Sequence, residues 1–230
     1  MVELVPLRIP AAGASATPAE LKRFFYDVYC DTPNPLRWLG SIRPYVCPYD
    51  KLVSFVRPGA SVLDLGCGPG SLLNLMAATA RIARGVGCDV SAPPLKSARA
   101  AARRLRAEKI LAFEHVRSMM DVPAGPFDAV VMVDVLHHVT AGERWDVIAT
   151  AVERVGPGGV FIYKDMTTRS RLRRLAHNLD DYAFTGEWVK QVRDGLVEKW
   201  AGEQGLVLEH SEYIPRLVYG HELRVFRRPH

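Results

Sequence analysis

Three glycines in alternate positions follow an apolar run and are the residues best suited to hold a ligand. Residues 62–70 read Val-Leu-Asp-Leu-Gly-Cys-Gly-Pro-Gly, so a buried strand is predicted to run into Gly66, Gly68 and Gly70 and then into a helix over 71–80. Glycines at such a turn let the backbone pass close to a ligand, and the helix start offers unpaired N–H groups. The segment therefore predicts a ligand-binding loop.

An acidic residue, Asp89, ends the next predicted strand and can accept hydrogen bonds from both hydroxyls of a ribose. The dinucleotide fingerprint Gly-x-Gly-x-x-Gly is not present, because the glycines fall at 66, 68 and 70 and Ser71 occupies the position of the third glycine. A turn without room for a pyrophosphate suits an adenosine ligand that carries no phosphate. The pattern thus disfavours NAD.

A second group of reactive side chains follows the predicted strand 129–133, where Asp134 precedes the pair His137 and His138. Ligands bind beyond the carboxyl ends of parallel strands, and an imidazole, with an unperturbed pKa of about 6.5, can remove a proton from a hydroxyl group. Both histidines are candidate catalytic residues, and we expect His137 to be the base. The alternative is that either one only packs or hydrogen-bonds at the sheet edge. Lys164 ends the next predicted strand at the same rim and is a candidate acceptor contact.

The elements that must position these residues follow an alternating pattern. Short apolar runs at 61–65, 85–89, 110–116, 129–133 and 159–163 are separated by helical stretches, which is typical of a parallel sheet buried on both faces. Two further strands are predicted at 206–214 and 217–226. A capping box from Thr140 to Glu143 predicts the start of one intervening helix, and Gly156-Pro157 predicts its end.

Two segments flank this pattern and are predicted to choose the acceptor. Residues 1–58 read as a helical lid or collar, in which the capping box Thr17 to Glu20 starts a helix and Tyr26, Tyr29 and Trp38 are pocket candidates. Residues 59–230 form the main domain, with a helical insert at about 167–191. In that insert Tyr182 and Trp188 are pocket candidates; the alternative is an ordinary packed helix with a solvated basic face.

The composition sets the protein class. The chain has 230 residues, 48% of them hydrophobic, and 30 Lys and Arg against 25 Asp and Glu, which excludes a disordered chain or a disulfide scaffold. The four cysteines lack Cys-x-x-Cys spacing and read as free thiols of a reducing compartment. No secretory leader and no apolar run of about 18 residues is found, so we expect a cytoplasmic protein.

Several of these motifs together resemble the class I S-adenosylmethionine-dependent methyltransferases. They are residues 62–70, Asp89, residues 127–139 and the run Gly156-Pro157-Gly158-Gly159. The resemblance implies an α/β fold with a Rossmann-like, doubly wound, seven-stranded, mostly parallel sheet and an antiparallel closing strand. It also implies S-adenosyl-L-methionine as the cofactor and methyl transfer to a small-molecule acceptor, with oxygen as the expected atom.

The resemblance further implies which residues hold the cofactor. Gly66, Cys67, Gly68 and Gly70 would line its methionine part, and Asp64 would reach its amino group. The remaining expected contacts are Asp89 for the ribose, Val90, Ser118 and Met119 for the adenine, Asp134 near the sulfonium and Arg43 for the carboxylate. Asp121 is an alternative to Ser118, and Arg37 is an alternative to Arg43.

Other acceptor classes remain as alternatives. A divalent metal is not expected, because Met166 stands where the catechol-type enzymes that this family includes place an Asn. The absence of an Asn-Pro-Pro-Tyr or Asp-Pro-Pro-Tyr segment disfavours a nucleobase nitrogen as acceptor. An RNA or protein methyltransferase, or a non-catalytic cofactor-binding module, stays open, and a homodimer is possible.

Overall fold

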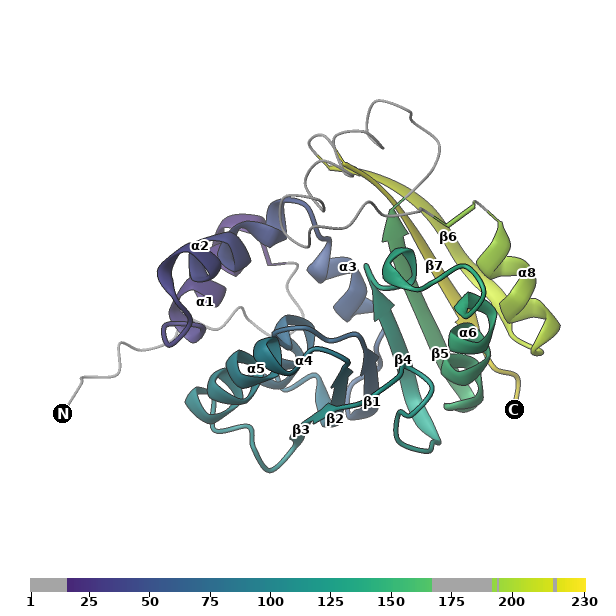
Figure 1. Ribbon diagram of the computed structural model, residues 1–230, viewed down its shortest axis with the longest axis horizontal. Coiled ribbons are helices and arrows are strands. Elements are labelled where there is room, and N and C mark those ends of the chain that lie inside the picture. The colour runs from purple at the N-terminus through teal and green to yellow at the C-terminus, as the bar shows by residue number, and fades with distance from the viewer. Residues whose placement is uncertain (1–15, 167–191, 194, 217–218) are drawn as a thin grey trace.

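A seven-stranded sheet forms the centre of the part of the chain that the computed structural model describes, residues 16–166, 192–193, 195–216 and 219–230 (Figure 1). Its order is β3-β2-β1-β4-β5-β7-β6, and within these ranges only β7 runs antiparallel to its neighbours. The strands are β1 (Ala60–Leu65), β2 (Ile82–Asp89), β3 (Leu111–His115), β4 (Phe127–Val133), β5 (Val155–Met166), β6 (Val207–Arg216) and β7 (Tyr219–Arg227). The predicted Rossmann-like sheet with its antiparallel closing strand is confirmed.

The position of the site follows from the strand order. The chain proceeds from β1 to β2 and β3 on one side and then returns to β4 on the other side of β1. At such a switch point the loops that follow the two central strands diverge and leave a crevice beyond their carboxyl ends. The glycine loop follows β1 and Asp134 follows β4, so the fold brings these two segments together.

Helices cover both faces of the sheet and create two cores. On one face lie α4 (Ser71–Ala78) and α5 (Ala92–Arg104), and on the other lie α6 (Arg144–Glu153) and α8 (Leu196–Glu203) (Figure 1). Alternate strand residues point into alternate cores: Val62 packs with the α4 and α5 side, whereas Leu63 packs with the α6 and α8 side. Both strand faces are therefore apolar, as the continuous runs predict.

A helical collar lies over the α4 and α5 side of the sheet (Figure 1). It consists of α1 (Pro18–Val28), α2 (Asn34–Ile42), the 3-10 turn η1 (Arg43–Tyr45) and α3 (Tyr49–Ser54). The Thr17 capping box is confirmed, since the Glu20 N–H donates to Thr17 Oγ1 at 3.3 Å and the Thr17 N–H donates to Glu20 Oε2 at 2.8 Å. Helix α2 was not predicted, because prolines read as breakers. Pro35 lies in its first turn, where a helix needs no N–H from that residue.

The predicted boundaries of α6 are wrong at both ends. The helix begins at Arg144 with Glu143 as its cap, and Thr140 Oγ1 donates to the Glu143 carboxylate at 2.5 Å, so this pair closes the turn before the helix. At the other end α6 stops at Glu153, and Gly156-Pro157 lies inside β5. The early start of β5 is accommodated by a register shift where Phe127 pairs with Val155.

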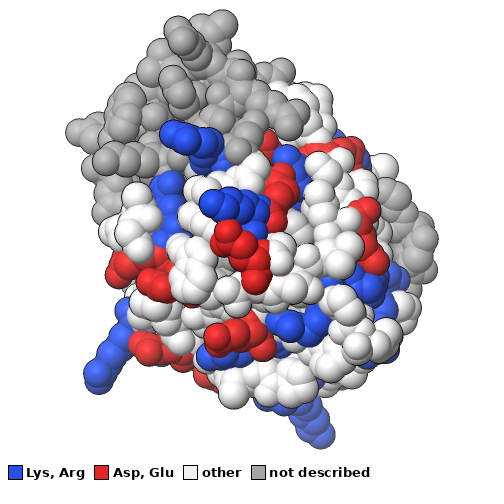
Figure 2. Space-filling view, turned by 90° about the vertical axis from the view of Figure 1, so that its right-hand side faces the viewer, with Lys and Arg blue, Asp and Glu red and all other residues white. Residues whose placement is uncertain are grey.

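Charged side chains of both signs are interspersed on the face that carries α6 and α8 (Figure 2). No helix in the described ranges is both long and apolar enough to cross a membrane. The predicted insert at 167–191, with Tyr182 and Trp188, lies outside the described residues.

Candidate functional site

The glycine loop turns sharply from β1 into α4, and each of its glycines has a left-handed φ, of 68°, 53° and 70° for Gly66, Gly68 and Gly70. A Cβ on Gly66 would lie 2.4 Å from Val135 Cγ2, and one on Gly70 would lie 2.5 Å from Phe113 Cε1. A Cβ on Gly68, by contrast, would meet no atom within 4 Å. The outer two glycines are thus required by packing, whereas Gly68 exposes its backbone to open space.

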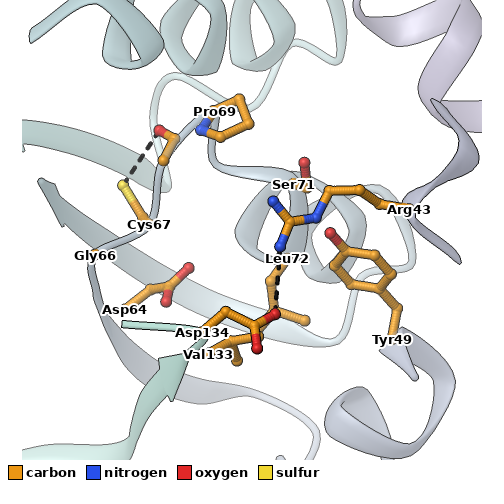
Figure 3. Close-up of a pocket in the computed structure, with 11 residues that line it drawn as sticks. Arg43, Tyr49, Asp64, Gly66, Cys67, Pro69, Ser71, Leu72, Val133 and Asp134 are labelled. Carbon is orange, nitrogen blue, oxygen red and sulfur yellow. Dashed lines mark hydrogen bonds and ion pairs between the residues drawn. The ribbon is translucent and has the colours of Figure 1, made fainter. Parts of the chain in front are cut away.

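A cavity of about 100 Å³ opens beside this loop (Figure 3). It brings together six of the predicted cofactor residues, Arg43, Asp64, Gly66, Cys67, Gly68 and Asp134. Its other lining residues are Tyr49, Pro69, Ser71, Leu72 and Val133. The collar, the loop after β1 and the end of β4 therefore share one pocket, as the switch-point geometry requires.

Asp64 lies in the wall of this cavity with its carboxyl group directed inward (Figure 3). Only 4% of the residue is exposed. Burial raises the pKa of Asp64 to about 8, and the nearby Asp89 carboxylate adds to the rise. The Asp64 carboxyl group is therefore mostly protonated at neutral pH, and a cation that enters the cavity would favour its ionisation.

Asp89, at the end of β2, holds the glycine loop from the side of the neighbouring strand. The Gly68 N–H donates to Asp89 Oδ2 at 2.7 Å, and the Ser91 N–H donates to Oδ1 at the same distance. The carboxylate touches the loop but is not part of the cavity wall. Val90, the next residue, is 51% exposed and so presents an apolar side chain to solvent beside it.

Asp134 carries the strongest ionic contacts at the cavity. The Lys164 ammonium donates to both of its carboxylate oxygens at 2.7 Å, and Arg43 Nη2 lies 3.3 Å from Oδ2 (Figure 3). Burial by itself would raise the pKa of Asp134, but the attraction of Lys164, with smaller effects of His221 and Arg43, holds it well below its usual range. Lys164 is completely buried, so its ammonium serves Asp134 in this structure.

The two candidate catalytic histidines have different surroundings. His137 is buried, with 3% exposure, and its Nδ1 forms a short hydrogen bond to Asp165 Oδ1 at the end of β5. His138 is exposed, and its ring centroid lies 4.1 Å from that of His137. Both sit on the turn η2 (Leu136–His138), which follows Asp134. Neither lines the cavity beside the glycine loop.

The predicted adenine contacts follow β3 and lie outside this cavity. Ser118 Oγ accepts a hydrogen bond from the Met120 N–H at 3.2 Å. Met119 is 7% exposed and packs into the core on the α6 and α8 side. The segment is nevertheless attached to the end of β2, because the Val116 N–H donates to the Asp89 carbonyl at 3.1 Å.

The predicted acceptor contacts of the collar do not converge. Tyr26 and Trp38 are 40% and 56% exposed, and the guanidinium of Arg37 lies 3.7 Å from the centre of the Tyr26 ring. Tyr29 is buried beneath the glycine loop instead, where its hydroxyl donates to the Pro69 carbonyl at 2.8 Å. Tyr29 thus contacts the loop and not the cavity.

Sequence reasoning missed Tyr49 as a lining residue. Its ring is 5% exposed, packs edge-to-face on Phe25 at 5.1 Å and reaches the cavity from the start of α3 (Figure 3). Burial raises its pKa far above the usual range of a tyrosine. Ser71, Leu72 and Val133 adjoin predicted residues in the chain, so their positions were within reach of the sequence; that of Tyr49 depends on how the collar packs.

No group of three or more His, Cys, Asp or Glu within the described ranges is placed to hold a metal ion. Asp134 and Asp165, which follow β4 and end β5, are engaged by Lys164 and His137 respectively. The four cysteines are free thiols.

Known proteins resemble this chain in sequence and in fold. The sequence pattern of the family described as "Methyltransferase domain" matches residues 41–211. The chain is 29% identical over 156 residues to the ubiquinone biosynthesis O-methyltransferase of Alkalilimnicola ehrlichii, and this alignment covers 65% of this chain and 62% of that protein. It is 27% identical over 204 residues to the protein of the same name from Thiobacillus denitrificans, with 85% and 78% covered. The first of these alignments thus spans less than two thirds of the relative.

A solved structure shares the fold. The magnesium protoporphyrin IX methyltransferase of Synechocystis PCC 6803 with bound SAH superposes with a TM-score of 0.66 at 20% identity, over 88% of this chain and 94% of that one. At this level of identity the likeness concerns the fold alone.

Proposed function

This chain belongs to the methyltransferase domain family, the class I S-adenosylmethionine-dependent methyltransferases, and from that premise we propose that it transfers a methyl group to a hydroxyl oxygen of a small molecule. The observation that carries the proposal is the loop at the switch point, where Gly68 has open space at its Cα, lines the cavity together with Asp64 and donates its N–H to Asp89. The two O-methyltransferases similar in sequence support oxygen as the acceptor atom.

The residues around the cavity fit S-adenosylmethionine. The Asp64 carboxyl group, buried and directed into the cavity, suits the cationic amino group, and Arg43 suits the carboxylate because its side chain is 44% exposed at the cavity. A guanidinium presents its N–H donors in a planar fork that matches a carboxylate, and the Arg43 guanidinium lies in the cavity wall beside Asp134. Gly66, Cys67 and Gly70 shape the loop, and Asp89 would accept hydrogen bonds from the ribose hydroxyls.

The adenine would lie against Val90 and the segment with Ser118 and Met119, which the Val116 bond attaches to β2. When bound, the cofactor supplies a methyl group already activated by a positively charged sulfur. The chain then has to align the acceptor oxygen and take its proton.

For the proton we propose His137, oriented by Asp165. A carboxylate that accepts a hydrogen bond from Nδ1–H fixes the tautomer of the imidazole and makes Nε2 the proton-accepting atom. The burial of His137 supports a fixed orientation. His138, exposed on the same turn, is the matched control.

The test is turnover of S-adenosylmethionine with a panel of small hydroxylated acceptors, read by mass spectrometry of the methylated products. We expect methyl transfer to oxygen with at least one acceptor and none with Asp89→Ala at low cofactor concentration. Cofactor binding without turnover on any acceptor would favour the non-catalytic module. Salt-dependent RNA binding would favour an RNA methyltransferase instead.

Location and assembly are further proposals. The four free thiols support a reducing compartment such as the cytoplasm. A homodimer stays a prediction, which sedimentation velocity of the purified chain tests directly.

A further inference from the structure

A buried chain of hydrogen bonds joins the collar to the underside of the glycine loop. Tyr29, the residue that caps the end of α1, donates its hydroxyl hydrogen to the Pro69 carbonyl at 2.8 Å. Asn74 of α4 donates from Nδ2 to the Tyr29 oxygen at 3.1 Å and to the Ala98 carbonyl at 3.3 Å. Tyr29 is 8% exposed and Asn74 is completely buried. A phenol has only one hydrogen to donate, so this arrangement directs it to Pro69.

Pro69 lies in the loop between two residues with a left-handed backbone, with φ of 53° at Gly68 and 70° at Gly70. Such a turn is held by its hydrogen bonds more than by local preference, since glycine costs the most entropy to fix. Asp89 accepts the Gly68 N–H from the β2 side. Tyr29 binds the Pro69 carbonyl from the collar side, so two neighbouring residues of the loop are held by two different elements, β2 and the end of α1.

The collar contributes to the same site in a second way. The Tyr29 ring lies 6.2 Å from that of Phe25, and Phe25 in turn packs on Tyr49, which lines the cavity. The hydroxyl contact with the loop is therefore made by a helix whose packing also places a wall of the cavity.

We propose that Tyr29 is a positioning residue that couples the collar to the cofactor loop, so that its hydroxyl tightens cofactor binding without taking part in methyl transfer. This rests on the proposed function, because it assumes that the loop binds S-adenosylmethionine. Coupling of this kind is reciprocal. If the collar stabilises the cofactor-binding loop, cofactor binding must in turn stabilise the collar and protect its backbone amides from hydrogen exchange.

The test compares Tyr29→Phe, which keeps the ring and removes the hydroxyl, with Tyr45→Phe, a collar tyrosine that is 39% exposed. Calorimetry with S-adenosylhomocysteine should show a dissociation constant about fivefold higher for Tyr29→Phe, the effect of one net hydrogen bond, and no change for Tyr45→Phe. At saturating cofactor kcat should stay within about twofold. In hydrogen exchange, cofactor should protect peptides from 18–28 in the natural protein and less in Tyr29→Phe.

Thermal unfolding of each variant separates this role from simple support of the fold. An unchanged dissociation constant together with a lower melting temperature would overturn the proposal, as would a fall in kcat with unchanged affinity. Failure of the proposed function is recognised separately, because the natural protein would then show no binding of S-adenosylhomocysteine. If Tyr29→Phe does not fold, Asn74→Asp, which replaces the amide that holds the phenol, serves as the second variant, with the same weaker binding expected and unchanged affinity contradicting the proposal.

Discussion

Raising the pH from 6 to 7 should tighten the binding of S-adenosylmethionine, because Asp64 must lose a proton before it can pair with the cationic amino group of the cofactor. The Asp64 pKa is about 8, raised by burial and by Asp89. The ionised fraction then rises from about 1% at pH 6 to about 9% at pH 7, which gives an increase in affinity of about ninefold. An α-amino group, with a pKa of about 8, stays mostly charged over this interval.

The other titratable groups in the cavity wall change little between these pH values. Burial raises the pKa of Cys67 far above the interval, and Lys164 and Arg43 hold that of Asp134 below it. Calorimetry at pH 6, 6.5 and 7, in two buffers with different ionisation enthalpies, measures both the affinity and the protons released. About 0.9 proton per cofactor is expected at pH 7. Asp64→Asn should bind more weakly, with no dependence on pH and no proton release.

The free energy of unfolding of the cofactor-free protein should also depend on Asp64, but it should fall with rising pH where the cofactor affinity rises. The folded protein binds the Asp64 proton more tightly than the unfolded chain, whose aspartate has its ordinary pKa of 3.8. This contribution is complete below pH 3.8 and is lost as the pH rises toward 8, by about 1.4 kcal/mol per pH unit. Urea titrations of the cofactor-free protein at pH 6 and 7 test this against Asp64→Asn. Equal affinity at both pH values, with no proton released, would refute the reasoning.

Three further substitutions test the site. Asp89→Ala should weaken cofactor binding by about 1–3 kcal/mol in calorimetry, since a charged acceptor of hydrogen bonds is lost; unchanged affinity would remove the ribose assignment. His137→Gln should lower kcat by roughly 10²–10⁴-fold with cofactor affinity intact, whereas His138→Gln should keep the rate; a fully active His137→Gln would return that residue to a structural role. Lys164→Met should lower the free energy of unfolding by about 1–3 kcal/mol in urea, because the partly buried carboxylate of Asp134 loses its main partner, and an unchanged free energy of unfolding would contradict the assigned ion pair.

The sequence predicts the parts of the site that are adjacent in the chain. The loop from Gly66 to Gly70 and the acid at Asp89 follow directly from strand ends, and parallel strands bring such ends to one edge of the sheet. The contacts of Tyr29 with Pro69 and of Arg43 with Asp134 could not be predicted from the sequence, for a physical reason. Each depends on how the collar packs over the sheet, which local propensity and periodicity do not describe.

Lys164 shows the same limit within a strand. Its position at the rim and a role as an acceptor contact were predicted, but its ion pair with Asp134 was not, because a lysine at a strand end normally reaches solvent. Here the side chain is completely buried and the adjacent strand presents Asp134 to it. The pairing register of β4 with β5, Val133 opposite Lys164, decides the contact, and register is a property of the assembled sheet.

The end of β5 links the two halves of the proposed chemistry. Successive residues of a strand point to opposite faces, so Lys164 and Asp165 cannot serve the same side of the sheet. Lys164 follows Ile162 into the core beneath the collar and holds Asp134 at the cofactor cavity, whereas Asp165 follows Tyr163 into the other core and holds His137. One dipeptide thus anchors a cavity wall on one face and the proposed base on the other.

This arrangement makes the two roles separable by substitution. Asp165→Asn should change the pH dependence of kcat, because the His137 imidazole loses a charged partner, and should leave cofactor affinity unchanged. A substitution of Lys164 should instead change cofactor affinity and stability. Because the two residues are neighbours in one strand, general damage to β5 would affect both properties in both variants, so a clean division between them can come only from the face that each side chain occupies.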